Sequence, residues 1–230
     1  YADYNDLMDL TEKLFHHICQ TVFGKMTFDI TCGKDEATRN EIIDFSKPFE
    51  RKTFKQSLVD IGGIPLGDIN DCQKSISYSL KNKVALEKKD SHAKVLGKLF
   101  DHFVEPNLIQ PIYITDYPLA LSPLSKKKEE DPSLVERFEL FVGGKEIANA
   151  YTELNDPIDQ KQRFEEQVCD RNEGDEEAHM MDLDFIRALE YGLPPTAGEG
   201  IGVDRLVMLL TNSQSIRDVI LFPQLKKNLN

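Results

Sequence analysis

Residues 137–156 read as two β-strands joined by a glycine pair, and they carry charged groups where strands normally bury apolar ones. Glu139, Glu146 and Glu153 recur among hydrophobic residues and do not form a charged run. A carboxylate set into a sheet needs a partner, because desolvating an unpaired charge is costly. The hairpin therefore predicts a metal ion, a cationic ligand or a buried arginine beside these glutamates.

The alternation of side chains along the two arms indicates which of them share a face. The even-numbered positions 138–142 in the first arm and 148–154 in the second are apolar or small, as expected for a strand face that packs on a core. Residues directly opposite each other in an antiparallel pair lie on the same face. One face of the sheet is therefore expected to carry the polar, odd-numbered residues Glu139, Asn149, Tyr151 and Glu153.

The glycine pair and Glu146 both require a departure from a regular hairpin. A strict two-residue turn at Gly143 and Gly144 would put the odd-numbered positions of the two arms on opposite faces. A three-residue turn or a β-bulge corrects this. Glu146 can join Glu139 only if the second arm is bulged near residues 145–148, and the sequence predicts that bulge. The alternative is an ordinary hairpin with an exposed polar face.

A second pattern, at residues 192–210, reads as a strand that leads into an apolar helix. Glycines at every second position leave one face of this strand bare, so a flat ring such as a purine can lie against the backbone. Arg205, at the start of the helix, can reach back to a phosphate. The alternative is a kinked strand with Arg205 in a structural ion pair with Asp204 or Glu199. The glycines of this strand are Gly198, Gly200 and Gly202.

Length and composition set further limits. A chain of 230 residues can form one large domain with a sizeable core. Its formal net charge of -12 argues against a nonspecific nucleic-acid binder. Four scattered cysteines suggest free thiols, not a zinc site or a disulfide framework. No apolar run approaches the roughly 18–20 residues of a membrane span, so a cytoplasmic protein without a membrane partner is expected.

Hydrophobic periodicity predicts an α+β fold, with a mainly antiparallel sheet flanked by helices. Helices are expected at 6–23, 54–60, within 70–105, at 156–169 and at 183–191, and an acidic segment at 173–177.

Taken together, the two motifs resemble those of the class II aminoacyl-tRNA synthetases and, within that class, of the lysine-specific family. Residues 137–156 match the lysine-specific strand pair, 192–205 match the third motif of the class, and 215–223 match its usual ending. The resemblance covers essentially the whole chain. It implies the class II catalytic fold, truncated at its N-terminus, because the anticodon-binding barrel and the first two motifs are missing. Residues 1–230 are then a partial catalytic domain.

The resemblance also implies a role for each candidate residue. In the ATP site, Glu139 and Glu146 are expected to hold Mg²⁺ that bridges the phosphates, and Arg205 is expected to be the catalytic contact to the γ-phosphate region. The glycines at 198, 200 and 202 belong to the same ATP-binding site. Asn149, Tyr151 and Glu153 are expected to line the lysine pocket, with Glu153 facing the substrate's ε-ammonium.

The implied activity belongs to a longer parent enzyme. That enzyme is expected to be a homodimer that activates L-lysine with ATP and Mg²⁺ to lysyl-adenylate and transfers the lysyl group to tRNA(Lys), whereas the fragment alone is expected to be inactive. Two alternatives stay open: a paralogue that ligates a lysine-like group to a protein, and a non-catalytic synthetase-like module used for interaction. The intact site residues argue against the second.

Overall fold

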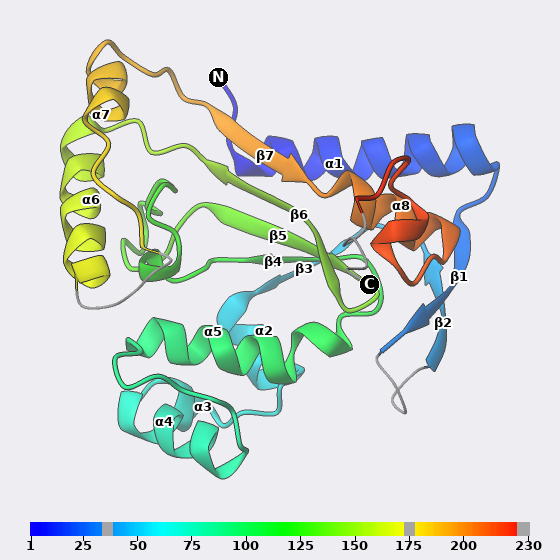
Figure 1. Ribbon diagram of the computed structural model, residues 1–230, viewed down its shortest axis with the longest axis horizontal. Coiled ribbons are helices and arrows are strands. Elements are labelled where there is room, and N and C mark those ends of the chain that lie inside the picture. The colour runs from blue at the N-terminus through cyan, green and yellow to red at the C-terminus, as the bar shows by residue number, and fades with distance from the viewer. Residues whose placement is uncertain (34–38, 173–177, 225–230) are drawn as a thin grey trace, which may run out of the picture.

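A five-stranded sheet crosses the centre of the computed structural model, which describes residues 1–33, 39–172 and 178–224 (Figure 1). The acidic segment predicted at 173–177 lies outside the described residues. The strand order is β3-β4-β5-β6-β7. Only the β3–β4 pair is parallel, and the other three pairs are antiparallel, which confirms the predicted mainly antiparallel sheet. The strands are β3 (Glu50–Thr53), β4 (Ile112–Thr115), β5 (Arg137–Val142), β6 (Lys145–Thr152) and β7 (Ala197–Ile201).

The β5–β6 hairpin contains the predicted bulge. Val142 pairs with Lys145 across a two-residue turn, so the three-residue turn is not used. The register then shifts between Leu140, which pairs with Ala148, and Phe141, which pairs with Glu146. Ile147 is the extra residue that this shift leaves unpaired. Glu146 and Asn149 therefore lie on the same face of β6, as the parity argument required.

The turn itself depends on its two glycines. Gly143 and Gly144 have φ values of 64° and 71°, in the left-handed region that a tight hairpin turn of this kind requires. A Cβ on Gly143 would also lie 2.7 Å from Cδ1 of Ile30.

Gly143→Ala is expected to lower the free energy of unfolding by about 1–3 kcal/mol, because it combines left-handed strain with crowding. Chemical denaturation of the two proteins measures the difference. The matched control is Gly67→Ala, at a position where an added Cβ meets nothing within 4 Å. Equal stabilities for Gly143→Ala and the unmodified protein would contradict the strain argument.

One face of the sheet packs on α1 (Tyr4–Ile18) and α8 (Val203–Thr211). The long helix predicted at 6–23 is confirmed, although its last turn, Cys19–Phe23, is π-helical. In Figure 1, α1 runs along the β7 side of the sheet, where it contacts β5, β6 and β7. A two-stranded ribbon of β1 (Thr27–Cys32) and β2 (Arg39–Asp44) extends this core. The strands contribute the predicted even-numbered apolar residues Phe138, Leu140, Val142, Ala148 and Ala150.

The opposite face is only partly covered. Helices α2 (Phe54–Asp60) and α5 (His92–Phe103) pack against Ile112, Ile114 and Phe141 of β4 and β5, forming a second core. Phe141 lies on the polar face of the hairpin, so this face is polar only beyond the reach of α5. No β6 or β7 residue belongs to the second core. The part of the face built by β6, β7 and the start of β5 is therefore left to polar side chains.

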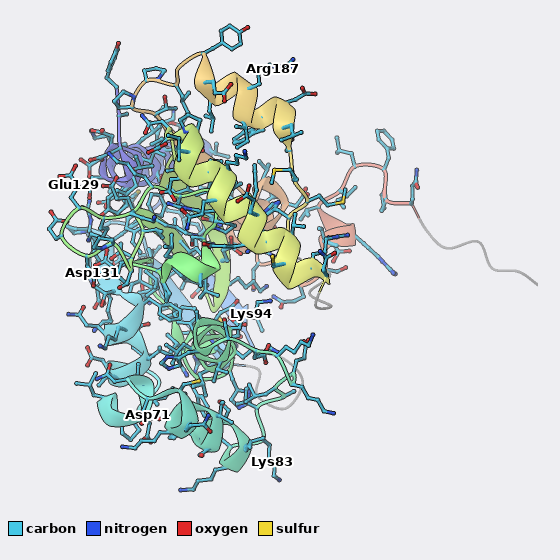
Figure 2. The ribbon with its side chains drawn as sticks, turned by 90° about the vertical axis from the view of Figure 1, so that its left-hand side faces the viewer. Asp71, Lys83, Lys94, Glu129, Asp131 and Arg187 are labelled. Carbon is cyan, nitrogen blue, oxygen red and sulfur yellow. The ribbon has the colours of Figure 1, made fainter. Side chains whose placement is uncertain are left out.

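The remaining helices lie at the two ends of the molecule. Helices α3 (Leu66–Ile69) and α4 (Cys72–Lys81) form a lobe beside α5, and α6 (Pro157–Asn172) packs on α7 (Leu183–Glu190) at the other end. Figure 2 shows Asp71 and Lys83 on the first lobe and Arg187 on α7 at the far end. Short 3₁₀ turns span Glu105–Asn107, Leu119–Leu121 and Ile216–Asp218. All four cysteines are free thiols. Within the described ranges no helix has the length and apolar character needed to cross a membrane.

Candidate active site

The bulged hairpin and β7 bring most of the predicted site residues to one face of the sheet. Glu139 pairs with Asn149 across β5 and β6, and Glu146 is carried to the same face by the bulge at Ile147. Across β6 and β7, Tyr151 pairs with Gly198 and Asn149 pairs with Gly200. Glu153 follows the end of β6, where its backbone N–H donates to Thr196 O at 2.9 Å.

Glu139 is held by two neighbours. The Arg137 guanidinium donates to Oε1 of Glu139, and the Tyr117 hydroxyl donates to Oε2 at 2.7 Å. The Glu139 side chain is only 15% exposed. Burial raises the pKa of Glu139, while the Arg137 charge and the Tyr117 hydrogen bond oppose the rise. A buried arginine was one of the partners the sequence allowed. Nothing in the sequence identified Tyr117, which a separate segment brings to the site.

Arg205 bonds to the second glutamate of the hairpin. Its Nη1 donates to the backbone O of Glu146 at 2.8 Å and lies 3.4 Å from Glu146 Oε2. The ion pair is therefore with Glu146 and not with Asp204 or Glu199. Glu199 accepts a hydrogen bond from Thr11 of α1, on the opposite face of the sheet. The Arg205 side chain is half exposed, so its guanidinium can still reach a ligand.

The three glycines of the second motif have different surroundings. A Cβ on Gly198 would overlap Oε1 of Glu153 and lie 3.3 Å from its Cδ, so the Glu153 carboxylate rests on the Gly198 backbone. On Gly200 the nearest atom to an added Cβ would be Asn149 O, at 3.9 Å. Gly202 is the N-cap position of α8, beside the Arg205 side chain. Gly200 therefore provides the open backbone, whereas Gly198 makes room for a carboxylate.

The carboxylates around Glu139 and Glu146 suit a divalent cation. Burial raises the pKa of Glu105, and so do the nearby charges of Asp101, Glu139 and Glu146. Such mutual repulsion between carboxylates is relieved when a cation binds between them. Across residues 1–33, 39–172 and 178–224, no three His, Cys, Asp or Glu side chains are arranged to hold a metal on their own. Mg²⁺ commonly uses one or two carboxylates together with water and ligand phosphates, so Glu139 and Glu146 fit this ion.

The pocket expected for lysine has a half-buried acidic end, formed by Glu153. Burial raises the pKa of Glu153, which indicates a carboxylate in a poorly hydrated place. Burial also raises the pKa of the Tyr151 hydroxyl, and the neighbouring Glu153 charge adds to the rise. A half-buried carboxylate beside an aromatic ring offers a cationic ligand both charge compensation and an apolar wall.

The structure thus places a bulged antiparallel strand pair with two glutamates next to a glycine-bearing strand, and the helix that follows this strand carries Arg205. The family described as tRNA synthetases class II (D, K and N) matches residues 1–226, and the chain belongs to this family. The match confirms the family resemblance and the fold class predicted from the two motifs.

The chain is also similar to curated relatives that are named lysine–tRNA ligase. It is 49% identical over 226 residues to the protein of Wolinella succinogenes. The matched region covers 98% of this chain and 43% of that relative. The identity is 46% over 226 residues for Halalkalibacterium halodurans and 49% over 228 residues for Teredinibacter turnerae. The chain thus spans less than half the length of these relatives, at 43%, 44% and 45%.

Proposed function

We propose that this chain forms a large part of the catalytic domain of an enzyme that activates L-lysine with ATP and transfers the lysyl group to tRNA(Lys). The observation that carries the proposal is the bulge at Ile147. It puts Glu146 on the same sheet face as Glu139 and Asn149, beside Gly200 and Arg205. A nucleotide site and an amino-acid site can then share one surface. The relatives named lysine–tRNA ligase support the choice of substrate.

The nucleotide end of this site consists of Glu139, Glu146, Gly200 and Arg205. Glu139 and Glu146 would hold Mg²⁺, which neutralises phosphate charge when it is bound. Arg205 would bind the γ-phosphate region by charge-assisted hydrogen bonds, exchanging part of its pairing with Glu146 for a phosphate. A flat ring of the nucleotide would lie against the open backbone at Gly200.

The amino-acid end consists of Asn149, Tyr151 and Glu153. The Glu153 carboxylate would face the ε-ammonium of lysine, and Gly198 would give that carboxylate its space. Bound in this way, an oxygen of the lysine carboxylate attacks the α-phosphorus of ATP, the bond from that phosphorus to the pyrophosphate oxygen breaks, and lysyl-adenylate forms. A hydroxyl at the 3′ end of the tRNA then attacks the lysyl carbonyl carbon, the bond from that carbon to the AMP oxygen breaks, and AMP leaves. Positioning and charge stabilisation account for the catalysis, without a covalent enzyme intermediate.

The partners follow from this activity. They are L-lysine, ATP, tRNA(Lys) and a second copy of the whole protein in a homodimer. We place the protein in the cytoplasm on the same ground, as a component of protein synthesis.

Lysine-dependent ATP–pyrophosphate exchange tests the proposal. The product of the gene that encodes this chain is expected to exchange label with lysine and with no other amino acid, and to lose the exchange when Mg²⁺ is chelated. The isolated 230-residue chain serves as a parallel sample to measure what it retains. Exchange with a different amino acid, or none by the gene product, would overturn the assignment. Exchange without any transfer to tRNA, together with lysylation of a protein, would favour the paralogue that modifies proteins.

The raised pKa of Glu153 predicts the pH dependence of lysine binding. Only the ionised carboxylate attracts the ammonium, and burial makes this carboxyl hold its proton to a higher pH than an ordinary glutamate. Lysine affinity is therefore expected to be complete above the raised pKa and to be lost as pH falls through it. Half-saturating lysine concentrations between about pH 5 and pH 8 measure this, in a range where unperturbed carboxyls are already ionised. Glu153→Gln should abolish this dependence, and its persistence would assign the titration to another group.

A further inference from the structure

Arg137 is the most highly connected side chain of the site. Its Nε donates to Asn149 Oδ1 at 3.1 Å, its Nη2 donates to Glu139, and its Nη1 donates to Leu121 O at 2.9 Å and to Ser122 Oγ at 2.7 Å. The guanidinium also lies over the Tyr117 ring, 4.8 Å from its centroid. A side chain so held, and only 14% exposed, cannot change conformation without breaking several bonds at once.

These bonds determine which end of the Asn149 amide faces Arg137. A guanidinium has hydrogen-bond donors and no acceptor, so only the carbonyl end of an amide can face it. Asn149 therefore turns Oδ1 toward Arg137, and its Nδ2 is on the opposite side of the amide. Asn149 lies between Glu139 on β5 and Gly200 on β7, in the middle of the polar face. What Asn149 can offer a ligand is a pair of N–H donors.

We propose that Arg137 is a positioning residue that fixes Asn149 as a hydrogen-bond donor to an anionic oxygen of the substrate. The inference rests on the proposed function, because it takes the substrate to be lysine with Mg-ATP. The anionic oxygen belongs either to the amino-acid carboxylate or to a phosphate, and separate titrations distinguish the two. In this arrangement Arg137 does not touch the substrate. It acts through its bond to Asn149, which also joins β5 to β6, whereas its bond to Glu139 lies within β5.

Arg163 of α6 provides a matched control. Its side chain is also largely enclosed, at 6% exposure, and its donors are also used by protein oxygens. Its Nε and Nη2 bond to Asp159 at 3.1 and 2.9 Å, and its Nη1 donates to Ser125 O at 2.6 Å. No residue of β5, β6 or β7 is among these partners. Arg163→Lys and Arg137→Lys therefore both disturb a buried arginine network, but only Arg137→Lys disturbs Asn149.

The first arm of the test observes the free protein by NMR. With arginine and asparagine labelled, the Arg137 Hε signal is expected to exchange slowly with solvent and to show coupling across the hydrogen bond to the side-chain carbonyl of Asn149. A rapidly exchanging Hε without that coupling would overturn the inference whatever the protein binds.

The second arm titrates L-lysine and Mg-ATP separately into the gene product by calorimetry. Arg137→Lys should weaken binding of one of the two ligands by about tenfold or more, as expected for a lost hydrogen bond to a charged group. Asn149→Asp keeps an acceptor for Arg137 but replaces the donor by an oxygen that repels an anion, so it should weaken the same ligand at least as much. Arg163→Lys should leave both affinities within about twofold.

The outcomes separate this inference from the proposed function. Loss of lysine affinity in both site variants identifies the amino-acid carboxylate as the acceptor, and loss of Mg-ATP affinity identifies a phosphate. Unchanged affinities in Arg137→Lys and Asn149→Asp, with normal binding by the unmodified protein, would overturn the inference and leave the proposed function intact. If the unmodified protein binds neither ligand, the proposed function fails, and the substrate role of Asn149 fails with it.

Discussion

Glu153→Gln is expected to raise the half-saturating lysine concentration by about a hundredfold, with a much smaller effect on ATP. The substitution keeps the size of the side chain and removes the charge that compensates the ε-ammonium of lysine. A charged group left unpaired in a poorly hydrated pocket costs about 2–5 kcal/mol, and each 1.4 kcal/mol is tenfold in affinity. Steady-state exchange, with lysine and ATP varied in turn, measures both quantities.

Glu199→Gln is the control for Glu153→Gln. Burial raises the pKa of Glu199 as it does that of Glu153, and Glu199 also belongs to the β7 side of the sheet. It lies on the opposite face, however, where it accepts a hydrogen bond from Thr11. Its substitution should leave the half-saturating lysine concentration within about twofold. Equal losses for lysine and ATP in Glu153→Gln, or an equal loss of lysine use in Glu199→Gln, would contradict the role proposed for Glu153.

Gly198→Ala is expected to weaken lysine use about tenfold or more while changing protein stability little. The added methyl group would displace the Glu153 carboxylate, which lies against the Gly198 backbone. Because that carboxylate is the free end of a flexible side chain, it can move away at small cost in folding free energy, typically within about 1 kcal/mol. Its new position no longer matches the ammonium, and small misplacements of a binding group are costly. Lysine half-saturation and chemical denaturation, measured on the same preparation, separate the two effects.

Gly200→Ala is the matched control two residues along the same strand. An added Cβ there meets only Asn149 O, at 3.9 Å, which is ordinary contact. We expect lysine use to stay close to that of the unmodified protein and any loss to appear with ATP. A loss of lysine use as large as that of Gly198→Ala would show that alanine in β7 acts through the strand and not through Glu153.

The fold near the site was predictable wherever alternation determined it. Parity along 137–156 required Glu146 to change face, and the structure confirms a bulge within 145–148. The alternation of side chains does not predict which residue of β6 is the extra one, here Ile147. It also does not predict that the turn between β5 and β6 has only two residues. Both depend on packing, since Ile147 is buried in the α1–α8 core and Gly143 is crowded by Ile30. These neighbours come from distant parts of the chain, which a local pattern does not contain.

The site was less predictable where contacts come from irregular segments. Tyr117, Leu121 and Ser122 precede β5 in a stretch with little regular structure, yet they hold Arg137 and Glu139 in place. Their spacing in the sequence does not predict these contacts. An irregular segment has no helical or strand repeat that fixes which side chains point toward the site. The different surroundings of Gly198 and Gly200 were hidden for a related reason. In the sequence both are glycines at alternate positions of one strand, so both predict bare backbone. Only the position of the Glu153 carboxylate, which lies against Gly198, distinguishes them.

The strand order has a consequence for how firmly the two halves of the site are held. Within the described part of the sheet, β5 and β6 each have hydrogen-bonded neighbours on both sides, whereas β7 is paired on one side only. Amides of a strand with one neighbour open to solvent more readily than those of an interior strand. In the 230-residue chain by itself, the glutamates of the hairpin therefore lie on the slowly opening part, and Gly198, Gly200 and the approach to Arg205 lie on the more easily opened part. A ligand that spans β6 and β7 would restrain β7 most, so for this chain by itself the ordering of β7 is part of the free energy of binding.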